Sequence, residues 1–213
     1  MASCLPSSPN KAAGHSTSDE GKNVMQTKLS TITNGVDITR MKETITAVKA
    51  APELGSFRFR IQNRWIDAGE TRSEVQPFTA GGKEVRHNSG FTLVADEPDV
   101  LLGSDRGANP VEHLLHALAS CVTTSTIYHA AARGIAVEQV ESTLEGVLDL
   151  NGFLGLNPNV RNGYQNITMK LRIKGDFTDE QLRELSSLGP QFSPVYDSIT
   201  RGVPVALSAE RMK

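Results

Sequence analysis

The longest apolar pattern in the chain covers residues 109–132. Asn109 is a favourable helix N-cap, and Pro110 takes the first helical position, where its missing N–H does no harm. Leucine, valine and alanine then recur with few polar residues between them, up to a stop signal at Gly134. A helix of this composition is typically buried nearly all round. We therefore predict a long central helix that packs between layers or across a dimer interface.

Shorter patterns before residue 109 predict one helix and three strands. A short amphipathic helix is expected over residues 36–51, ended by Pro52. Residues 56–66 alternate apolar and polar side chains, as a half-buried strand does, and two more strands are expected at 73–78 and 90–95. The turns between them are predicted at residues 67–70 and 81–82. Short turns of this kind indicate an antiparallel meander.

The pattern after the long helix predicts two strands, a helix and a strand. The two strands are expected at residues 138–150 and 165–174, and the long loop between them has the length of many functional loops. Thr178 has the capping-box spacing to a glutamine, so a second helix begins there and ends near residues 189–190. The last strand is expected at 203–208. This order predicts an α+β fold without repeats.

Composition narrows the cellular setting. Hydrophobic residues make up 38% of the chain, which is enough for a core without a membrane partner. The net charge is -2 and there is no basic cluster, so nucleic acid is not expected as a partner. No apolar stretch approaches the ~20 residues of a membrane span, and no secretory signal is visible. Two cysteines are too few for a disulfide framework, which favours the cytoplasm. Residues 1–36 are polar and are expected to be a disordered or loosely attached tail before a domain at 37–213.

Two motifs carry a family resemblance. The segment Asn109-Pro110-x-Glu112-x-Leu114-Leu115-x-Ala117-Leu118-Ala119-x-Cys121 resembles the long-helix motif of the OsmC/Ohr family of osmotically inducible and organic-hydroperoxide-resistance proteins. Ser193-Pro194-Val195 resembles the start of the second motif, where Cys-Pro-Val or a similar triplet is usual. The predicted element order agrees from about Ser56 to the C-terminus. The resemblance implies an intertwined homodimer with the long helices in its middle and active sites at the subunit interface.

The resemblance also implies a chemistry for Cys121. In the family the first cysteine attacks a hydroperoxide and becomes a sulfenic acid, which a second cysteine converts to a disulfide. Cys121 matches the first position, whereas Ser193 stands at the second and cannot form a disulfide. An external thiol would then have to reduce the sulfenic acid. Two hypotheses follow: a one-cysteine peroxidase, favoured by Cys121, or a dimer that binds a small apolar ligand without turnover, favoured by Ser193.

A cation must lower the pKa of a catalytic thiol from ~8.5, because Cys121 lies too far into the helix for the helix dipole. The family uses an arginine from its N-terminal strands, which Arg72 matches, with Arg64 and Arg86 as rivals. The family's acidic residue after Asn-Pro is replaced by Val111. Glu112 is half a revolution out of phase with Cys121, so it is expected to be a first-turn acid favoured by the helix dipole.

The remaining candidates concern a pocket and a metal. Ser193 is expected either to hydrogen-bond the thiol or a ligand, or to cap the turn before Pro194; no serine-hydrolase motif surrounds it. His113 and His116 can share one side of the helix, but they do not complete a set of three or four metal ligands, so neither a metal nor another cofactor is expected. An apolar interface pocket is expected to be lined by Phe153, Leu154, Leu156, Phe192 and Tyr196.

Overall fold

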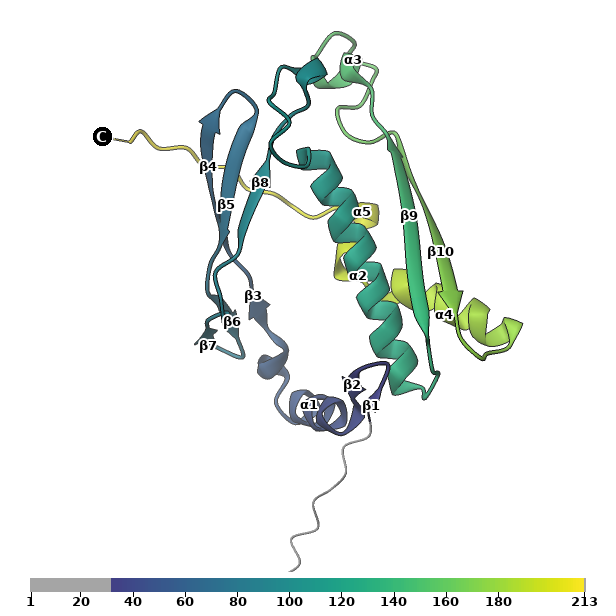
Figure 1. The fold of residues 1–213 in the computed structure, drawn as a ribbon. Coiled ribbons are helices and arrows are strands. Elements are labelled where there is room, and N and C mark those ends of the chain that lie inside the picture. The colour runs from purple at the N-terminus through teal and green to yellow at the C-terminus, as the bar shows by residue number, and fades with distance from the viewer. Residues whose placement is uncertain (1–31, 213) are drawn as a thin grey trace, which may run out of the picture.

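The computed structural model describes residues 32–212 of the 213-residue chain. Its packed part is built around helix α2 (Pro110–Ala132), with helices α4 (Asp179–Phe192) and α5 (Pro194–Arg201) on one side. Strands β9 (Gln139–Val147) and β10 (Asn166–Lys174) form an antiparallel pair next to these helices (Figure 1). Both strands lie within the segments predicted from the sequence.

Helix α2 has the predicted bounds but not the predicted burial. The side chain of Asn109 accepts from the backbone N–H of Val111, and Glu112 closes a capping box at the same end. The buried positions follow one stripe, and Tyr128, on another side, is 52% exposed. The prediction of a helix buried nearly all round is therefore wrong for one chain, because α4, α5 and β9 cover only part of its circumference. The buried stripe comprises Leu118, Val122, Thr126, Ala130 and Ala131.

Helix α4 packs closely on α2 through a glycine. A Cβ atom on Gly189 would lie 2.6 Å from Cγ1 of Val122 and 2.7 Å from Oγ1 of Thr126, so a larger residue does not fit without movement. The predicted end near residues 189–190 is wrong, because α4 continues through Pro190 to Phe192. Burial of Leu185 and Leu188 around this crossing outweighs the backbone hydrogen bond that a proline removes. Helix α5 follows at once and was not predicted.

The N-terminal strands form two small antiparallel sheets. Strands β4 (Ile61–Asp67), β5 (Glu70–Val75) and β8 (Thr92–Ala95) make the predicted meander in the order β4-β5-β8. The strand predicted at residues 56–66 is interrupted, so its first part, β3 (Phe57–Arg58), belongs to the other sheet. That sheet has the order β3-β6-β7 and is completed by β6 (Phe78–Ala80) and β7 (Lys83–Val85).

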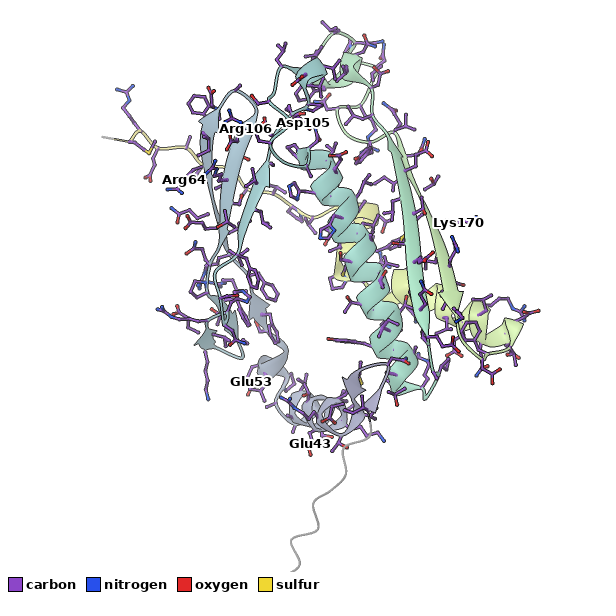
Figure 2. All side chains as sticks on the ribbon, in the orientation of Figure 1. Glu43, Glu53, Arg64, Asp105, Arg106 and Lys170 are labelled. Atoms are coloured by element: carbon purple, nitrogen blue, oxygen red, sulfur yellow. The ribbon has the colours of Figure 1, made fainter. Side chains whose placement is uncertain are left out.

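The β4-β5-β8 sheet has one apolar and one charged face. Residues opposite each other in an antiparallel ladder point to the same face. Ile61 is opposite Val75, and Trp65 is on the same face two pairs further along. On the other face Arg64 is opposite Arg72, and Figure 2 shows Arg64 on the side of β4 turned away from α2. All residues of β4 are exposed, so the predicted half-buried strand is wrong for a single chain, which has no element covering the apolar face among its described residues.

The first described residues are part of the fold. Strands β1 (Ile32–Thr33) and β2 (Val36–Asp37) form a hairpin, and helix α1 (Ile38–Ala50) follows near the predicted place. The side chain of Asn34 donates to the carbonyl of Ile135 at 2.9 Å and accepts from the N–H of Val137 at 2.8 Å. The tail predicted at residues 1–36 therefore differs at residues 32–36, which are anchored after α2. The rest of that prediction, including Cys4, lies outside the described residues.

Short elements complete the chain. The 3-10 helices are Pro52–Gly55 and Asp99–Leu101, and α3 (Leu150–Phe153) lies in the predicted long loop. The strand predicted at residues 203–208 is wrong within one chain, because this segment has no pairing partner there and Val205 is 86% exposed. None of the helices between residues 32 and 212 has both the length and the apolar character of a membrane span.

Candidate functional site

Cys121 lies at the edge of the packed stripe of α2. It is a free thiol of intermediate burial. Its neighbours on the helix, Leu118 and Val122, line a cavity of about 460 Å³, although Cys121 itself is not among the lining residues. Among the described residues, no hydrogen bond or ion pair holds the Cys121 sulfur. The thiol is therefore positioned by the helix alone within one chain.

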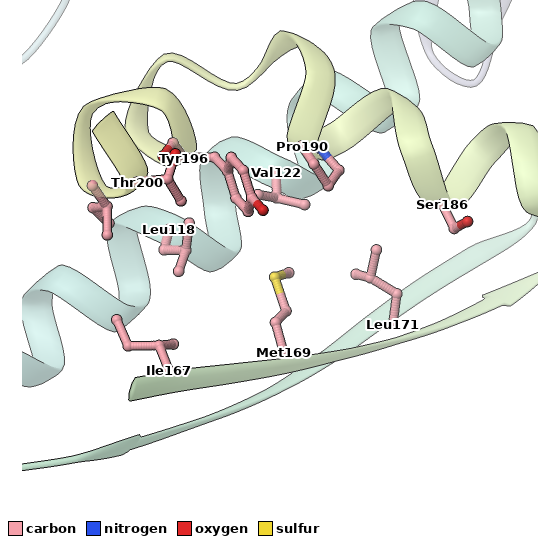
Figure 3. A pocket seen from close by; sticks show the side chains of 10 residues that line it. Leu118, Val122, Ile167, Met169, Leu171, Ser186, Pro190, Tyr196 and Thr200 are labelled. Carbon is pink, nitrogen blue, oxygen red and sulfur yellow. Dashed lines mark hydrogen bonds between the residues drawn. The ribbon is translucent and has the colours of Figure 1, made fainter. Parts of the chain in front are cut away.

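The cavity beside Cys121 is enclosed by α2, β10, α4 and α5 (Figure 3). Its walls are mainly apolar, and the hydroxyl-bearing residues Ser186, Tyr196 and Thr200 supply its polar atoms. Of these lining residues, Tyr196 was expected from the sequence, whereas the wall from β10 was not. That wall had a signal in the strict alternation of residues 166–174, which puts three apolar side chains on one face. They are Ile167, Met169 and Leu171.

Ser193 occupies the junction between α4 and α5. It is 2% exposed, and its side-chain oxygen accepts from the N–H of Tyr196 at 3.1 Å, so it caps α5. This is the capping role that the sequence left open. The hydroxyl of Ser125 donates to the carbonyl of Phe192 at 3.3 Å, and Ser125 lies one turn after Cys121 on the same side of α2. The structure thus brings the Ser193 junction to the part of α2 that carries Cys121.

Arg72 is not brought to Cys121 within one chain. Its Nε and Nη2 atoms donate to one oxygen of Glu70 at 2.9 and 2.8 Å, and Arg106 donates to the other oxygen at 2.9 Å. Glu70 is 2% exposed, and the hydrogen bonds from Arg72 first and Arg106 second hold its pKa below the ordinary value. Arg72 therefore serves a buried carboxylate on the charged face of the sheet. The rivals Arg64 and Arg86 likewise pair with exposed glutamates.

The other expected pocket residues are separated. Phe153 and Leu154 line a second cavity at the N-terminal end of α2, and Leu156 is 69% exposed. Phe192 stacks on His129, with the ring centroids 3.7 Å apart, and lines neither cavity. Burial first and the charge of Arg133 second lower the pKa of His129 below its ordinary value. The five residues do not form one pocket in a single chain.

His113, near the start of α2, has a structural contact, whereas His116 is exposed. Nε2 of His113 is 3.0 Å from the carbonyl oxygen of Val94, which links α2 to strand β8. Glu112 accepts from the N–H of Asn109, as a first-turn acid in a capping box does. Between residues 32 and 212, no three histidine, cysteine or acidic side chains gather as a metal site would require.

Comparison with known proteins identifies the fold. A family model described as OsmC-like protein matches residues 103–208. An OsmC-like protein from Mycoplasma pneumoniae is 15% identical, with a TM-score of 0.51 over 67% of this chain and 87% of that chain. An OsmC-like protein of unknown function from Vibrio cholerae is 16% identical, with a TM-score of 0.50 over 66% and 92%. No curated protein matches the chain. The α+β fold predicted from the sequence is confirmed.

Proposed function

Because the chain belongs to the OsmC-like protein family, we propose that it is a stress-protective thiol peroxidase in which Cys121 alone reduces organic hydroperoxides. The resemblance to the OsmC/Ohr family implies a link to osmotic stress and to hydroperoxide resistance. The observation that carries the proposal is the position of Cys121 at the edge of the packed stripe of α2, between an apolar cavity and the Ser193 junction. Leu118 and Val122, which line this cavity, are the neighbours of Cys121 on the helix, so an apolar hydroperoxide in the cavity would lie close to the thiol.

The reaction needs one cysteine and an external thiol. The Cys121 thiolate attacks the outer peroxide oxygen, the O–O bond breaks, and the products are a sulfenic acid and an alcohol. Two external thiols then reduce the sulfenic acid, which gives back the Cys121 thiol, one disulfide between the external thiols, and water. Ser193 takes no part in electron transfer, because a hydroxyl cannot form a disulfide. It keeps the α4–α5 junction in place beside Cys121.

We further propose that the working form is a homodimer. One chain leaves two apolar surfaces uncovered: the face of the β4-β5-β8 sheet that carries Ile61 and Trp65, and the side of α2 that carries Tyr128. Two copies of the chain can cover each other's apolar surfaces, so no other protein is needed for this. The proposal does not depend on Arg72, which is held by Glu70 on the opposite, charged face. The cation that activates the thiol is then expected from the partner subunit.

The test is the rate at which the Cys121 thiol is lost. In a chain with Cys4→Ser, Cys121 is the one remaining thiol. Stoichiometric cumene hydroperoxide is expected to consume it in the native protein roughly tenfold faster than in denaturant-unfolded protein, because lowering a thiol pKa by one unit raises the thiolate fraction about that much. The alcohol product should appear in equal amount. A native rate no higher than the unfolded rate would overturn the peroxidase proposal.

A second candidate function is binding without turnover. The observation that favours it is the cavity of about 460 Å³, which has apolar walls and hydroxyl groups but no charged lining residue. Such a site suits a neutral, mainly apolar molecule with one hydrogen-bonding group. Cumyl alcohol, which has the shape of the hydroperoxide without its reactive bond, serves as the probe. If it raises the melting temperature while the thiol rate stays at the unfolded value, the binding function replaces the peroxidase.

A further inference from the structure

A second cavity, of about 300 Å³, lies at the N-terminal end of α2, away from Cys121. Three segments meet there: the loop at residues 97–102, the first turn of α2, and the segment 148–154 that contains α3 (Figure 1). Val111, which lines it, precedes Cys121 by ten residues, or about 15 Å along the helix axis. The cavity is therefore a separate site from the one beside the thiol.

The walls of the second cavity are almost entirely apolar. Leu101 and Leu102 come from the loop, Val111 from α2, and Phe153 and Leu154 from α3 and the residue after it. Several of these side chains are well exposed for their type, with Leu102 at 87% and Phe153 at 63%. Exposed apolar side chains that gather around a hollow are typical of a ligand site rather than of a core.

Hydrogen bonds to the Asp96 side chain fix the loop that builds one wall of this cavity. The carboxylate of Asp96 is 1% exposed and accepts the backbone N–H groups of Glu97, Ser104 and Arg106 at 2.8, 3.2 and 3.1 Å. Leu102 caps the 3-10 helix Asp99–Leu101 in the left-handed region, with φ of 66°, and its N–H donates to the carbonyl of Asp99. Figure 2 shows the end of the loop, at Arg106, between the sheet and the start of α2. The hydrogen bonds to Asp96 and this cap together give the wall a fixed shape.

Glu97 is the one ionisable residue that lines the cavity. One oxygen of its carboxylate accepts from the side-chain amide of Asn109. Burial first, and the negative charges of Asp96 and Glu112 after it, raise the pKa of Glu97 above the ordinary value. The guanidinium of Arg106, at the end of the same loop, is bound to Glu70. The local field is therefore negative, so it attracts a cation and repels an anion.

We propose that this cavity binds a small amphipathic cation, in which an ammonium group pairs with Glu97 and an apolar chain lies against Leu101, Phe153 and Leu154. The fixed loop supplies the shape, the apolar walls supply most of the affinity, and the carboxylate selects the charge. This binding does not rest on the thiol chemistry, because its residues and those around Cys121 are different.

Isothermal titration of the full chain with decylamine, decanol and decanoate tests the proposal. The three probes share one chain length and differ in the charge of the head group; all are used below the concentration at which they aggregate. Decylamine is expected to bind about fivefold more tightly than decanol, since a partly exposed ion pair contributes up to ~1 kcal/mol, and decanoate should bind most weakly. Phe153→Ala is expected to weaken all three probes, because it removes part of the shared wall.

Two further variants isolate the charge. Glu97→Gln keeps a hydrogen-bonding group of the same size but removes the charge. The affinity of this variant for decylamine should therefore fall to its affinity for decanol. Glu145→Gln, on the exposed side of β9, makes the same chemical change elsewhere and should leave all three affinities unchanged. If Glu97→Gln unfolds the chain, the order of the three affinities in the unchanged protein tests the proposal instead. Equal affinity for the three probes, or no binding of any, would overturn the proposal whether or not Cys121 reacts with hydroperoxide.

Discussion

Glu70 is a buried acid at the start of strand β5. Arg72 and Arg106 hold both oxygens of its carboxylate, and the two arginines come from a strand and from the loop before α2. One carboxylate therefore ties the hairpin to that loop. Its burial without both arginines would leave an unpaired charge, which is strongly unfavourable.

The pKa of Glu70 predicts a pH dependence of stability. Because its folded-state pKa lies below the ordinary value of 4.5, the stabilisation is complete above that pH and is lost as the pH falls through the folded-state value. The free energy of unfolding should therefore decrease as the pH is lowered below 4.5. Glu70→Gln should be less stable at neutral pH and should lose less stability on acidification.

Urea denaturation between pH 3 and pH 7 measures this dependence. Glu74→Gln is the control, since that glutamate pairs with Arg64 on the exposed surface and should change little. Asp96 and Asp149 also have lowered pKa values, so some acid sensitivity should remain in Glu70→Gln. Parallel pH profiles for Glu70→Gln and the unchanged chain would show that the carboxylate contributes no charge stabilisation.

At the scale of elements, Asn34 connects the first hairpin to the turn after α2. Its side chain donates to Ile135 and accepts from Val137, in the pattern of an added strand. Its own φ of 52° lies in the left-handed region. Asn34→Gly should lower the free energy of unfolding by about 2 kcal/mol, since each lost hydrogen bond contributes ~1 kcal/mol.

Asn34→Ala separates the hydrogen bonds from the backbone conformation. Alanine loses the same two bonds and also adopts a left-handed backbone at a further cost of about 1 kcal/mol. Chemical denaturation of the two variants should therefore rank asparagine above glycine and glycine above alanine. An alanine variant as stable as the unchanged chain would mean that the hairpin is not anchored through Asn34.

Elements with local signals were predictable from the sequence. The bounds of α2 follow from Asn109, Pro110 and Gly134, and the start of α4 follows from its capping box. The signals that failed depend on distant partners: α4 crosses Pro190 because of its packing on α2, and the segment after Gly202 has no strand to pair with in one chain. Arg72 was predicted from the family resemblance as the arginine beside the thiol. Its pairing with Glu70, two residues earlier on the same face of β5, was missed because the strand was predicted to begin at residue 73.

At the scale of the whole molecule, one sheet face has no covering element among the described residues. The β4-β5-β8 sheet keeps an apolar face open, on which Trp65 is 71% and Ile61 is 56% exposed. A large exposed apolar face of this kind is typical of a protein–protein interface. Among residues 32–212, no cationic side chain is bonded to the Cys121 sulfur, and the proposed dimer would supply one from the second copy. Both the uncovered sheet face and the proposed thiol chemistry therefore favour the proposed second copy of the chain.

The proposed dimer predicts different effects for two adjacent positions. Ile61→Lys puts a charge on the apolar face, whereas Gln62→Lys puts the same charge on the opposite face. Sedimentation at micromolar concentration should show a dimer for the unchanged chain and for Gln62→Lys, with Ile61→Lys weakened by about a hundredfold or more, since burial of an unpaired charge costs several kcal/mol. Trp65, the single tryptophan, should be shielded from acrylamide in the first two proteins and accessible in the third. A folded monomer for the unchanged chain, with Trp65 as accessible as in Ile61→Lys, would refute the dimer, and the thiol would then have to find its cation elsewhere.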